Sequence, residues 1–144
     1  MILIIVSAVV FLDQLSKLFA LSNLQLNTPV ILIKDFFYLT LVHNRGAAFG
    51  MFKNQLILFI AISLFAISFI FIHLKNKKNP LIHKLSLGLI LAGAFGNLID
   101  RLRLGYVVDF LDFRVWPVFN LADSALTIGA LLLSWELLFN KNVT

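Results

Sequence analysis

The 144-residue chain contains no cysteine, which excludes disulfide bonds, thiol catalysis and thiolate metal ligands. Charged side chains are scarce as well: they make up 13% of the residues, whereas hydrophobic residues make up 60%. A soluble domain of this size needs many more polar groups to cover its surface. A disordered chain needs low hydrophobicity and high charge. The composition therefore predicts an integral membrane protein.

Four apolar runs are long enough to cross a bilayer, and together they fill most of the chain. They cover about 1–21, 54–74, 81–101 and 118–139. At 1.5 Å per residue, the second run alone spans roughly 30 Å, the thickness of the hydrocarbon core. We expect one membrane domain, 1–144, with four transmembrane helices. A cleaved signal peptide is the alternative for the first run, but Asp13 interrupts it and no basic segment precedes it, so a retained helix is favoured.

The segment at about 24–50 has a different pattern. Val30–Ile33 and residues 36–42 are rich in β-branched and aromatic side chains, with Lys34 and Asp35 between them. This pattern predicts a short β-hairpin, followed by a turn at 43–46. The expected fold class is therefore an all-α integral membrane protein, with four transmembrane helices and a small β-hairpin or cradle on the outer face.

Lysines indicate the orientation in the membrane. Lys75, Lys77, Lys78 and Lys84 crowd the link between the second and third runs, and the positive-inside rule places such a link in the cytoplasm. Both termini are then cytoplasmic, and 22–53 and 102–117 lie outside. The formal net charge of +5 does not indicate nucleic acid, because the basic residues lie between apolar runs and act there as topology signals and contacts to anionic lipid.

In this topology, ionisable residues from four stretches lie near the outer leaflet. Asp13 and Lys17 lie in the outer half of the first helix, Asp100 at the end of the third, Asp109 on the outer link and Asp123 near the start of the fourth. Ionisable residues inside a membrane mark functional sites. Two carboxylates in a low-dielectric site can share one proton and act as general base and general acid. The three histidines do not form a metal set, so no metal is expected.

Purely structural roles are the alternative to a functional role for these ionisable residues. Asp13 and Lys17 are four residues apart and could simply neutralise each other, as could Asp100 and Arg103 at a spacing of three. Asp123 could cap its own helix. Small residues at Gly88, Gly93 and Gly96 predict close packing of the third helix against a neighbour.

Two asparagines each lie three residues before an aspartate. Asn97 lies one turn before Asp100, and Asn120 one turn before Asp123. Each amide shares a helix face with its carboxylate and could hold it by a hydrogen bond. Ordinary polar packing between helices is the alternative.

Five blocks, in order along the chain, resemble the lipoprotein signal peptidase family, also called signal peptidase II. They are 13–17 (DQLSK), 44–50 (NRGAAFG), 96–101 (GNLIDR), 107–110 (VVDF) and 119–124 (FNLADS). The resemblance implies an aspartyl endopeptidase of the bacterial cytoplasmic membrane that removes the signal peptide from diacylglyceryl-modified prolipoproteins, just before the lipidated cysteine. It implies no cofactor, contacts with membrane lipids and inhibition by globomycin-type cyclic peptides.

The resemblance also implies roles for particular residues. The catalytic pair would be Asp109 and Asp123. The supporting and substrate-binding positions would be Asp13, Lys17, Asn44, Arg45, Gly46, Asn97, Asp100, Arg101 and Asn120.

Two questions remain open from the residues alone. Asp100 is a rival for the catalytic role, although we expect it to pair with a cation, such as Lys17 across the bundle. A small proton-coupled carrier or lipid-binding protein is the alternative class. The clustering of the acids at one leaflet disfavours a carrier, because it leaves no path to the other side.

Overall fold

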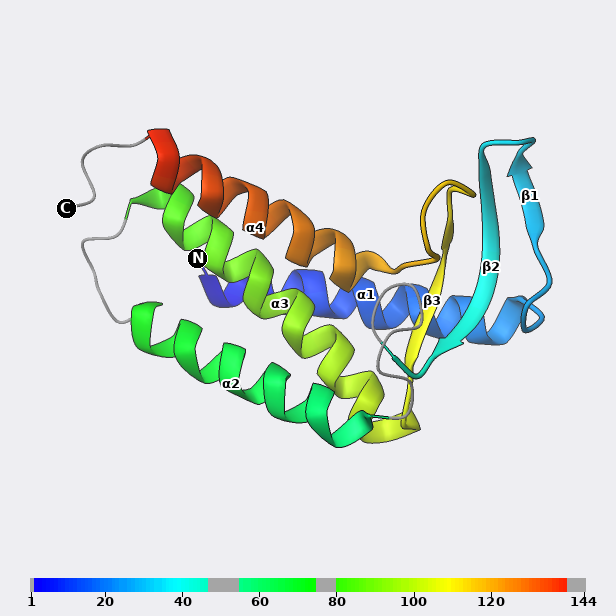
Figure 1. The fold of residues 1–144 in the computed structure, drawn as a ribbon, viewed down its shortest axis with the longest axis horizontal. Helices are drawn as coiled ribbons and strands as arrows, with labels where there is room; N and C mark the ends of the chain where they lie inside the picture. Colours follow the sequence, from blue (N-terminus) through cyan, green and yellow to red (C-terminus); the bar gives the residue numbers. More distant parts are fainter. Residues whose placement is uncertain (1, 47–54, 75–79, 140–144) are drawn as a thin grey trace.

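The computed structural model describes residues 2–46, 55–74 and 80–139. The helices of this part of the chain are α1 (Ile2–Asn23), α2 (Leu56–Leu74), α3 (Leu81–Leu104) and α4 (Leu121–Phe139). The strands are β1 (Val30–Ile33), β2 (Phe37–Asn44) and β3 (Val107–Asp112). Figure 1 shows the strands together at one end of the bundle, beyond α4 and beside the last turns of α1, while α1 begins and α4 ends toward the opposite end.

The predicted membrane spans are confirmed. All four helices are long and apolar enough to cross a membrane, and each lies within a few residues of its predicted range. The largest differences are three residues each: α4 begins at Leu121 and not at 118, and α3 continues three residues past 101. It ends at Gly105, whose φ of 78° is left-handed and whose N–H bonds to the carbonyl of Arg101. Glycine adopts this conformation without steric cost, which explains where the helix stops.

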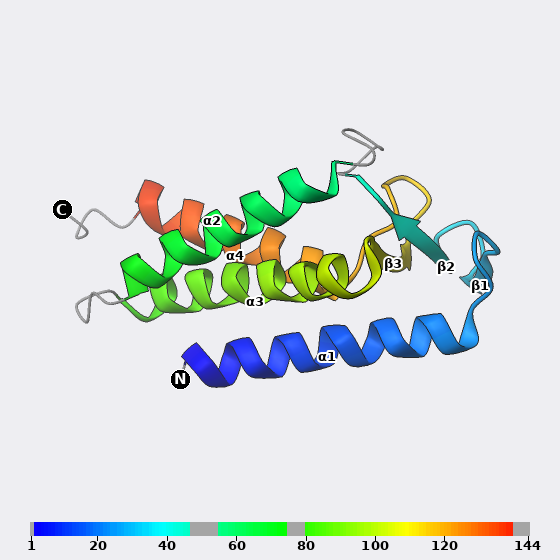
Figure 2. The same cartoon turned by 90° about the horizontal axis from the view of Figure 1, so that it is seen from below.

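Helix α3 forms the centre of the bundle and packs against each of the other three helices. Figure 2 shows α1 along one side of α3, with α2 and α4 on the other. In the most apolar 18-residue window of α3, 56% of the residues are buried, compared with 11–22% in the other helices. Many large apolar side chains of α1, α2 and α4 are exposed, as expected for helices surrounded by lipid.

Two of the three predicted small-residue positions bring helices close together. A Cβ atom added at Gly93 would collide with the carbonyl oxygen of Ala122 on α4. One added at Gly96 would lie 2.5 Å from Oδ2 of Asp13 on α1. At Gly88 the nearest atom would be 3.7 Å away, an ordinary contact. Farther from the sheet, α4 also approaches α3 closely, because a Cβ atom added at Gly129 would lie 2.8 Å from the carbonyl oxygen of Ser86.

The strands form an antiparallel sheet in the order β1-β2-β3. The hairpin prediction is confirmed, but the predicted turn is wrong for His43 and Asn44, which continue β2. Residues 47–50 of the predicted outer segment lie outside the described part. Sequence reasoning missed β3, because its apolar run is short and was assigned to a link. The pairing of β2 with β3 sets Val42 opposite Asp109, which brings Asn44 to that carboxylate.

Candidate active site

Asp109 lies on β3 and is almost completely buried. Asn44 of the neighbouring strand donates a hydrogen bond from Nδ2 to Asp109 Oδ2 over 2.9 Å. Asn120, just before α4, donates from its Nδ2 to Oδ1 over 2.6 Å. The backbone N–H of Gly46 donates to Oδ1 of Asn44, and this contact turns the Asn44 amide so that its NH₂ group faces the carboxylate. Asp109 is thus held from both sides by amide donors.

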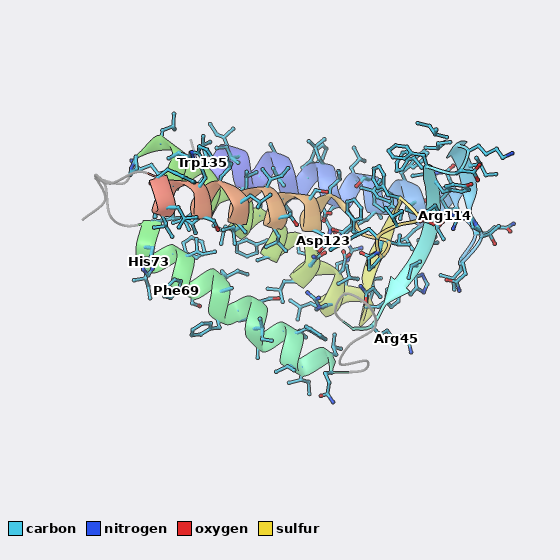
Figure 3. All side chains as sticks on the ribbon, turned by 45° about the horizontal axis from the view of Figure 1, so that its top comes forward. Arg45, Phe69, His73, Arg114, Asp123 and Trp135 are labelled. Atoms are coloured by element: carbon cyan, nitrogen blue, oxygen red, sulfur yellow. The ribbon has the colours of Figure 1, made fainter. Side chains whose placement is uncertain are left out.

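Asp123 lies in the first turn of α4, at the end of that helix nearest the strands (Figure 3). Its backbone N–H donates to Oδ1 of Asn120 over 2.9 Å, so Asn120 is the residue that caps the helix. The N–H of Ala122 donates to Oδ1 of Asp13. The alternative in which Asp123 caps α4 is therefore wrong, and its carboxylate is left available for chemistry.

The two asparagines do not hold the carboxylates that their spacing predicted. Asn97 donates from Nδ2 to Oδ1 of Asp123 over 2.7 Å, across the α3–α4 interface. Asn120 donates to Asp109 on the strand. The expected pairs within one helix are replaced by pairs between elements, because the close approach of α3 and α4 points these side chains at each other. The prediction that these asparagines hold carboxylates is therefore correct, but the aspartate predicted for each of them is wrong.

A buried ion cluster lies directly beside this pair of amides. Lys17 Nζ is 2.8 Å from Asp13 Oδ2 and 2.9 Å from Asp100 Oδ2, and all three side chains are at most 4% exposed. The predicted pairing of Asp13 with Lys17 and the predicted contact of Lys17 with Asp100 are both confirmed. Asp100 Oδ1 also accepts a hydrogen bond from Gln14 Nε2 over 2.9 Å. Gln14 is not among the site residues predicted from the sequence, although its position next to Asp13 could have indicated it.

The remaining candidates lie at the edge of the site. The guanidinium of Arg101 lies 5.1 Å from the centre of the Phe59 ring, a contact that joins α3 and α2 near their ends closest to the sheet. Arg45 is exposed at the end of β2 and does not enter the buried cluster.

Two cavities give access to Asp123. One of about 290 Å³ is lined by Asn44, Gly46, Asn97, Arg101, Val107, Trp116, Pro117, Val118, Phe119, Asp123, Leu126 and Thr127. The other, of about 360 Å³, shares Trp116, Phe119, Asp123 and Thr127 with it and is more apolar. The short link between β3 and α4 thus supplies an aromatic wall over the carboxylate.

The electrostatics of Asp109 suit acid–base chemistry. Burial raises the pKa of its carboxyl to about 7, with a further contribution from the nearby charge of Asp123. The amide donors Asn44 and Asn120 and the charge of Lys17 act in the opposite direction. Near neutral pH, both the protonated and the ionised forms of Asp109 are therefore accessible, so it can donate or accept a proton.

The histidines lie elsewhere. His83 Nδ1 is 2.9 Å from Oε2 of the buried Glu136, at the end of α3 and α4 away from the sheet. His73 is near the end of α2 (Figure 3). Among the described residues, no three His, Cys, Asp or Glu side chains are placed to hold a metal ion.

The four helices are long enough to span a membrane, and the carboxylates of Asp109 and Asp123 are linked through the amides of Asn97 and Asn120, beside two cavities that Asp123 lines. This arrangement is typical of a multi-pass membrane hydrolase of the aspartic type. The family model for signal peptidase (SPase) II matches residues 5–139. The chain belongs to the signal peptidase II family, whose members cleave signal peptides from prolipoproteins.

Relatives and solved structures agree with this family. A lipoprotein signal peptidase from Halothermothrix orenii is 51% identical over 92% of each chain. One from Caldanaerobacter subterraneus is 47% identical over 99% of each chain. The fold matches a bacterial membrane enzyme solved by the in meso method at 2.3 Å resolution, with a TM-score of 0.91 and 31% identity, over 99% of this chain and 92% of that one.

Proposed function

We propose that Asp109 and Asp123 are the catalytic pair and that they hydrolyse the peptide bond preceding a diacylglyceryl-modified cysteine in prolipoproteins. The observation that carries this proposal is the joint placement of the two carboxylates. Both accept hydrogen bonds from the Asn97–Asn120 pair of amides, and Asp123 lines two cavities. One carboxylate takes a proton from the attacking water, while the other donates a proton to the leaving amine.

Asp100 is better explained as a structural acid. Its two oxygens accept from Lys17, from Gln14 and from the backbone N–H of Val108. Three donors thus already occupy its two oxygens, and one of them is the ammonium that neutralises its charge. We therefore assign the catalytic role to Asp109, whose strand contributes Val107 to the lining of the 290 Å³ cavity. An active Asp109→Asn enzyme with a dead Asp100→Asn enzyme would reverse this assignment.

The position of the site supports entry of the substrate from the membrane. The cavities lie where α3, α4 and the β3–α4 link meet, at the sheet end of the bundle. We place this end at the outer leaflet of a bacterial cytoplasmic membrane, with both termini in the cytoplasm. The apolar signal helix of the substrate then enters sideways from the lipid, and its diacylglyceryl chains stay in the outer leaflet. A globomycin-type cyclic peptide would inhibit by occupying the same cavities.

The test is a cleavage assay with a diacylglyceryl-modified prolipoprotein in detergent or liposomes, followed by gel shift. We expect turnover by the unmodified protein and at least a 10³-fold loss in Asp109→Asn and in Asp123→Asn. Both variants should elute as folded protein in size-exclusion chromatography. Substantial turnover by either folded variant would refute the pair.

A further inference from the structure

Lys17 is the only cation of the buried cluster, and it makes three contacts with acceptors. Its Nζ lies 2.8 Å from Asp13, 2.9 Å from Asp100 and 3.1 Å from Oδ1 of Asn97. An ammonium group has three N–H donors and no acceptor. The three contacts therefore use all of its donors, and two of them neutralise carboxylates that are not part of the catalytic pair.

The third contact determines how the Asn97 amide is turned. Because Lys17 can only donate, Asn97 must present its carbonyl oxygen to it. The NH₂ group of Asn97 then points the other way and donates to Asp123 over 2.7 Å. A turned amide would place its NH₂ group against the ammonium and its oxygen against a carboxylate, which is unfavourable on both sides.

The same oxygen also orients the second amide. Oδ1 of Asn97 accepts from Nδ2 of Asn120 over 3.1 Å, so the NH₂ group of Asn120 faces inward. That NH₂ group also donates to Asp109 over 2.6 Å, and the carbonyl oxygen of Asn120 caps α4. Two amides that could each be turned either way are thereby held in one arrangement.

We infer that Lys17 is a positioning residue that, through Asn97, holds the NH₂ groups of Asn97 and Asn120 toward the catalytic carboxylates, although it touches neither Asp109 nor Asp123. This inference rests on the proposed function of that pair. It differs from a purely structural role, in which Lys17 only neutralises Asp13 and Asp100. A structural role would affect how much enzyme folds, whereas a positioning role also changes the protonation of the pair.

The pH profile separates the two roles. The charge of Lys17 and the amide donors Asn120 and Asn44 favour the ionised carboxylate of Asp109, which is outside the spanning helices, whereas the charge of Asp123 disfavours it. Lys17→Met removes the charge and the constraint on Asn120 but leaves Asn44 in place, so it should raise the pKa of Asp109 further. In Lys17→Met we therefore expect the acidic limb of the kcat/KM profile to move up by about one pH unit and kcat to fall at least about tenfold, with a smaller change in KM.

Glu136→Gln is the matched control. It also disrupts a side-chain contact between helices, the 2.9 Å contact of the buried Glu136 with His83, but at the far end of α3 and α4. Both variants should melt at lower temperature than the parent protein, and only Lys17→Met should shift the pH profile. A Lys17→Met enzyme with the parental profile would overturn the inference while leaving the catalytic pair intact. Failure of the parent protein to cleave any lipidated substrate would instead overturn the proposed function.

A charge-balanced double variant tests the inference if Lys17→Met does not fold. Asp100→Asn with Lys17→Met removes one negative and one positive charge, so the net charge of the cluster is unchanged. Its profile is compared with that of the parent protein, whose cluster has the same net charge, and with that of Asp100→Asn alone, which keeps the contact from Lys17 to Asn97. The inference predicts the upward shift in the double variant only, and equal profiles would overturn it.

Discussion

Asn120 shows how much a single side chain contributes at this site. Its oxygen caps α4, and its nitrogen donates to both Asp109 and Asn97. It is completely buried, so a lost donor cannot be replaced by bulk water. The start of the helix and the position of the catalytic carboxylate are therefore linked through one amide.

The two roles of Asn120 can be separated by substitution. Serine is a good N-cap but is too short to reach Asp109, whereas alanine provides neither function. We expect Asn120→Ser to keep more thermal stability than Asn120→Ala, by about 1 kcal/mol, while both lose activity. Thermal melts in detergent and the cleavage assay check this. Equal melting temperatures for the two variants would show that the cap contributes little.

The pKa of Asp109 gives a second prediction at the residue scale. Its folded-state pKa of about 7 is above the ordinary value of 3.8, so the folded protein binds this proton more tightly than the unfolded chain does. The contribution of Asp109 to stability therefore falls as pH rises from about 4 to about 7, and above 7 the buried charge is destabilising. Asp109→Asn removes that charge.

We expect Asp109→Asn to be inactive yet to melt at a higher temperature than the parent protein at pH 8, with the difference shrinking toward pH 5. Melting curves across this pH range measure it. Asp112→Asn provides a control on the same strand, because its carboxylate is tied to Thr40 and to Arg114. A parent protein that gains stability from pH 5 to 8 relative to Asp109→Asn would contradict the prediction.

At the scale of elements, the close packing of α3 against α4 sets the distance between Asn97 and Asp123. The Cα atom of Gly93 lies so near the Ala122 carbonyl that a methyl group has no room. Asn97 lies on α3 and Asp123 lies on α4. Any displacement of α4 therefore lengthens the 2.7 Å hydrogen bond between these two side chains.

Gly93→Ala should therefore lower both the melting temperature and kcat. Gly88→Ala is the matched control, since it lies on the same helix and its added methyl group would make only ordinary contacts with Ile2 and Ile5. Alanine is the better helix former by about 1 kcal/mol, so we expect Gly88→Ala to be unchanged or slightly more stable. A Gly93→Ala enzyme with parental activity would show that α4 tolerates the shift.

At the scale of the whole molecule, the two ends of the bundle are chemically different. The sheet end contains the buried carboxylates and amides, whereas the opposite end contains the His83–Glu136 pair and the aromatic pair Trp135 and Phe139, whose ring centres are 4.4 Å apart. Helices with apolar side chains facing outward connect the two ends. Which end faces the cytoplasm decides where the substrate is cleaved.

The absence of native cysteine makes the orientation directly measurable. Single cysteines are introduced at Lys34, exposed in the turn between β1 and β2, and at Lys78, in the link between α2 and α3. A membrane-impermeant maleimide applied to intact cells should label Lys34→Cys at once and Lys78→Cys only after lysis. The reverse pattern would invert the proposed topology and place the site at the inner leaflet.

Much of this protein follows from sequence because membrane physics imposes it. Four long apolar runs must be helices, since no other open structure satisfies the backbone in lipid. Acids such as Asp13 and Asp123 within those runs require partners, so they mark the functional end of the bundle. Hence the spans, the hairpin and the residue types of the site were predictable.

The tertiary structure decided which of those residues meet. Asn97 pairs with Asp123 and Asn120 with Asp109, because Gly93 and Gly96 let three elements approach closely. The third strand, which carries Asp109, is stabilised by pairing with β2, a contact between segments more than sixty residues apart that no local pattern reveals. Sequence determines which groups must be buried, and only packing determines which partner each buried group finds.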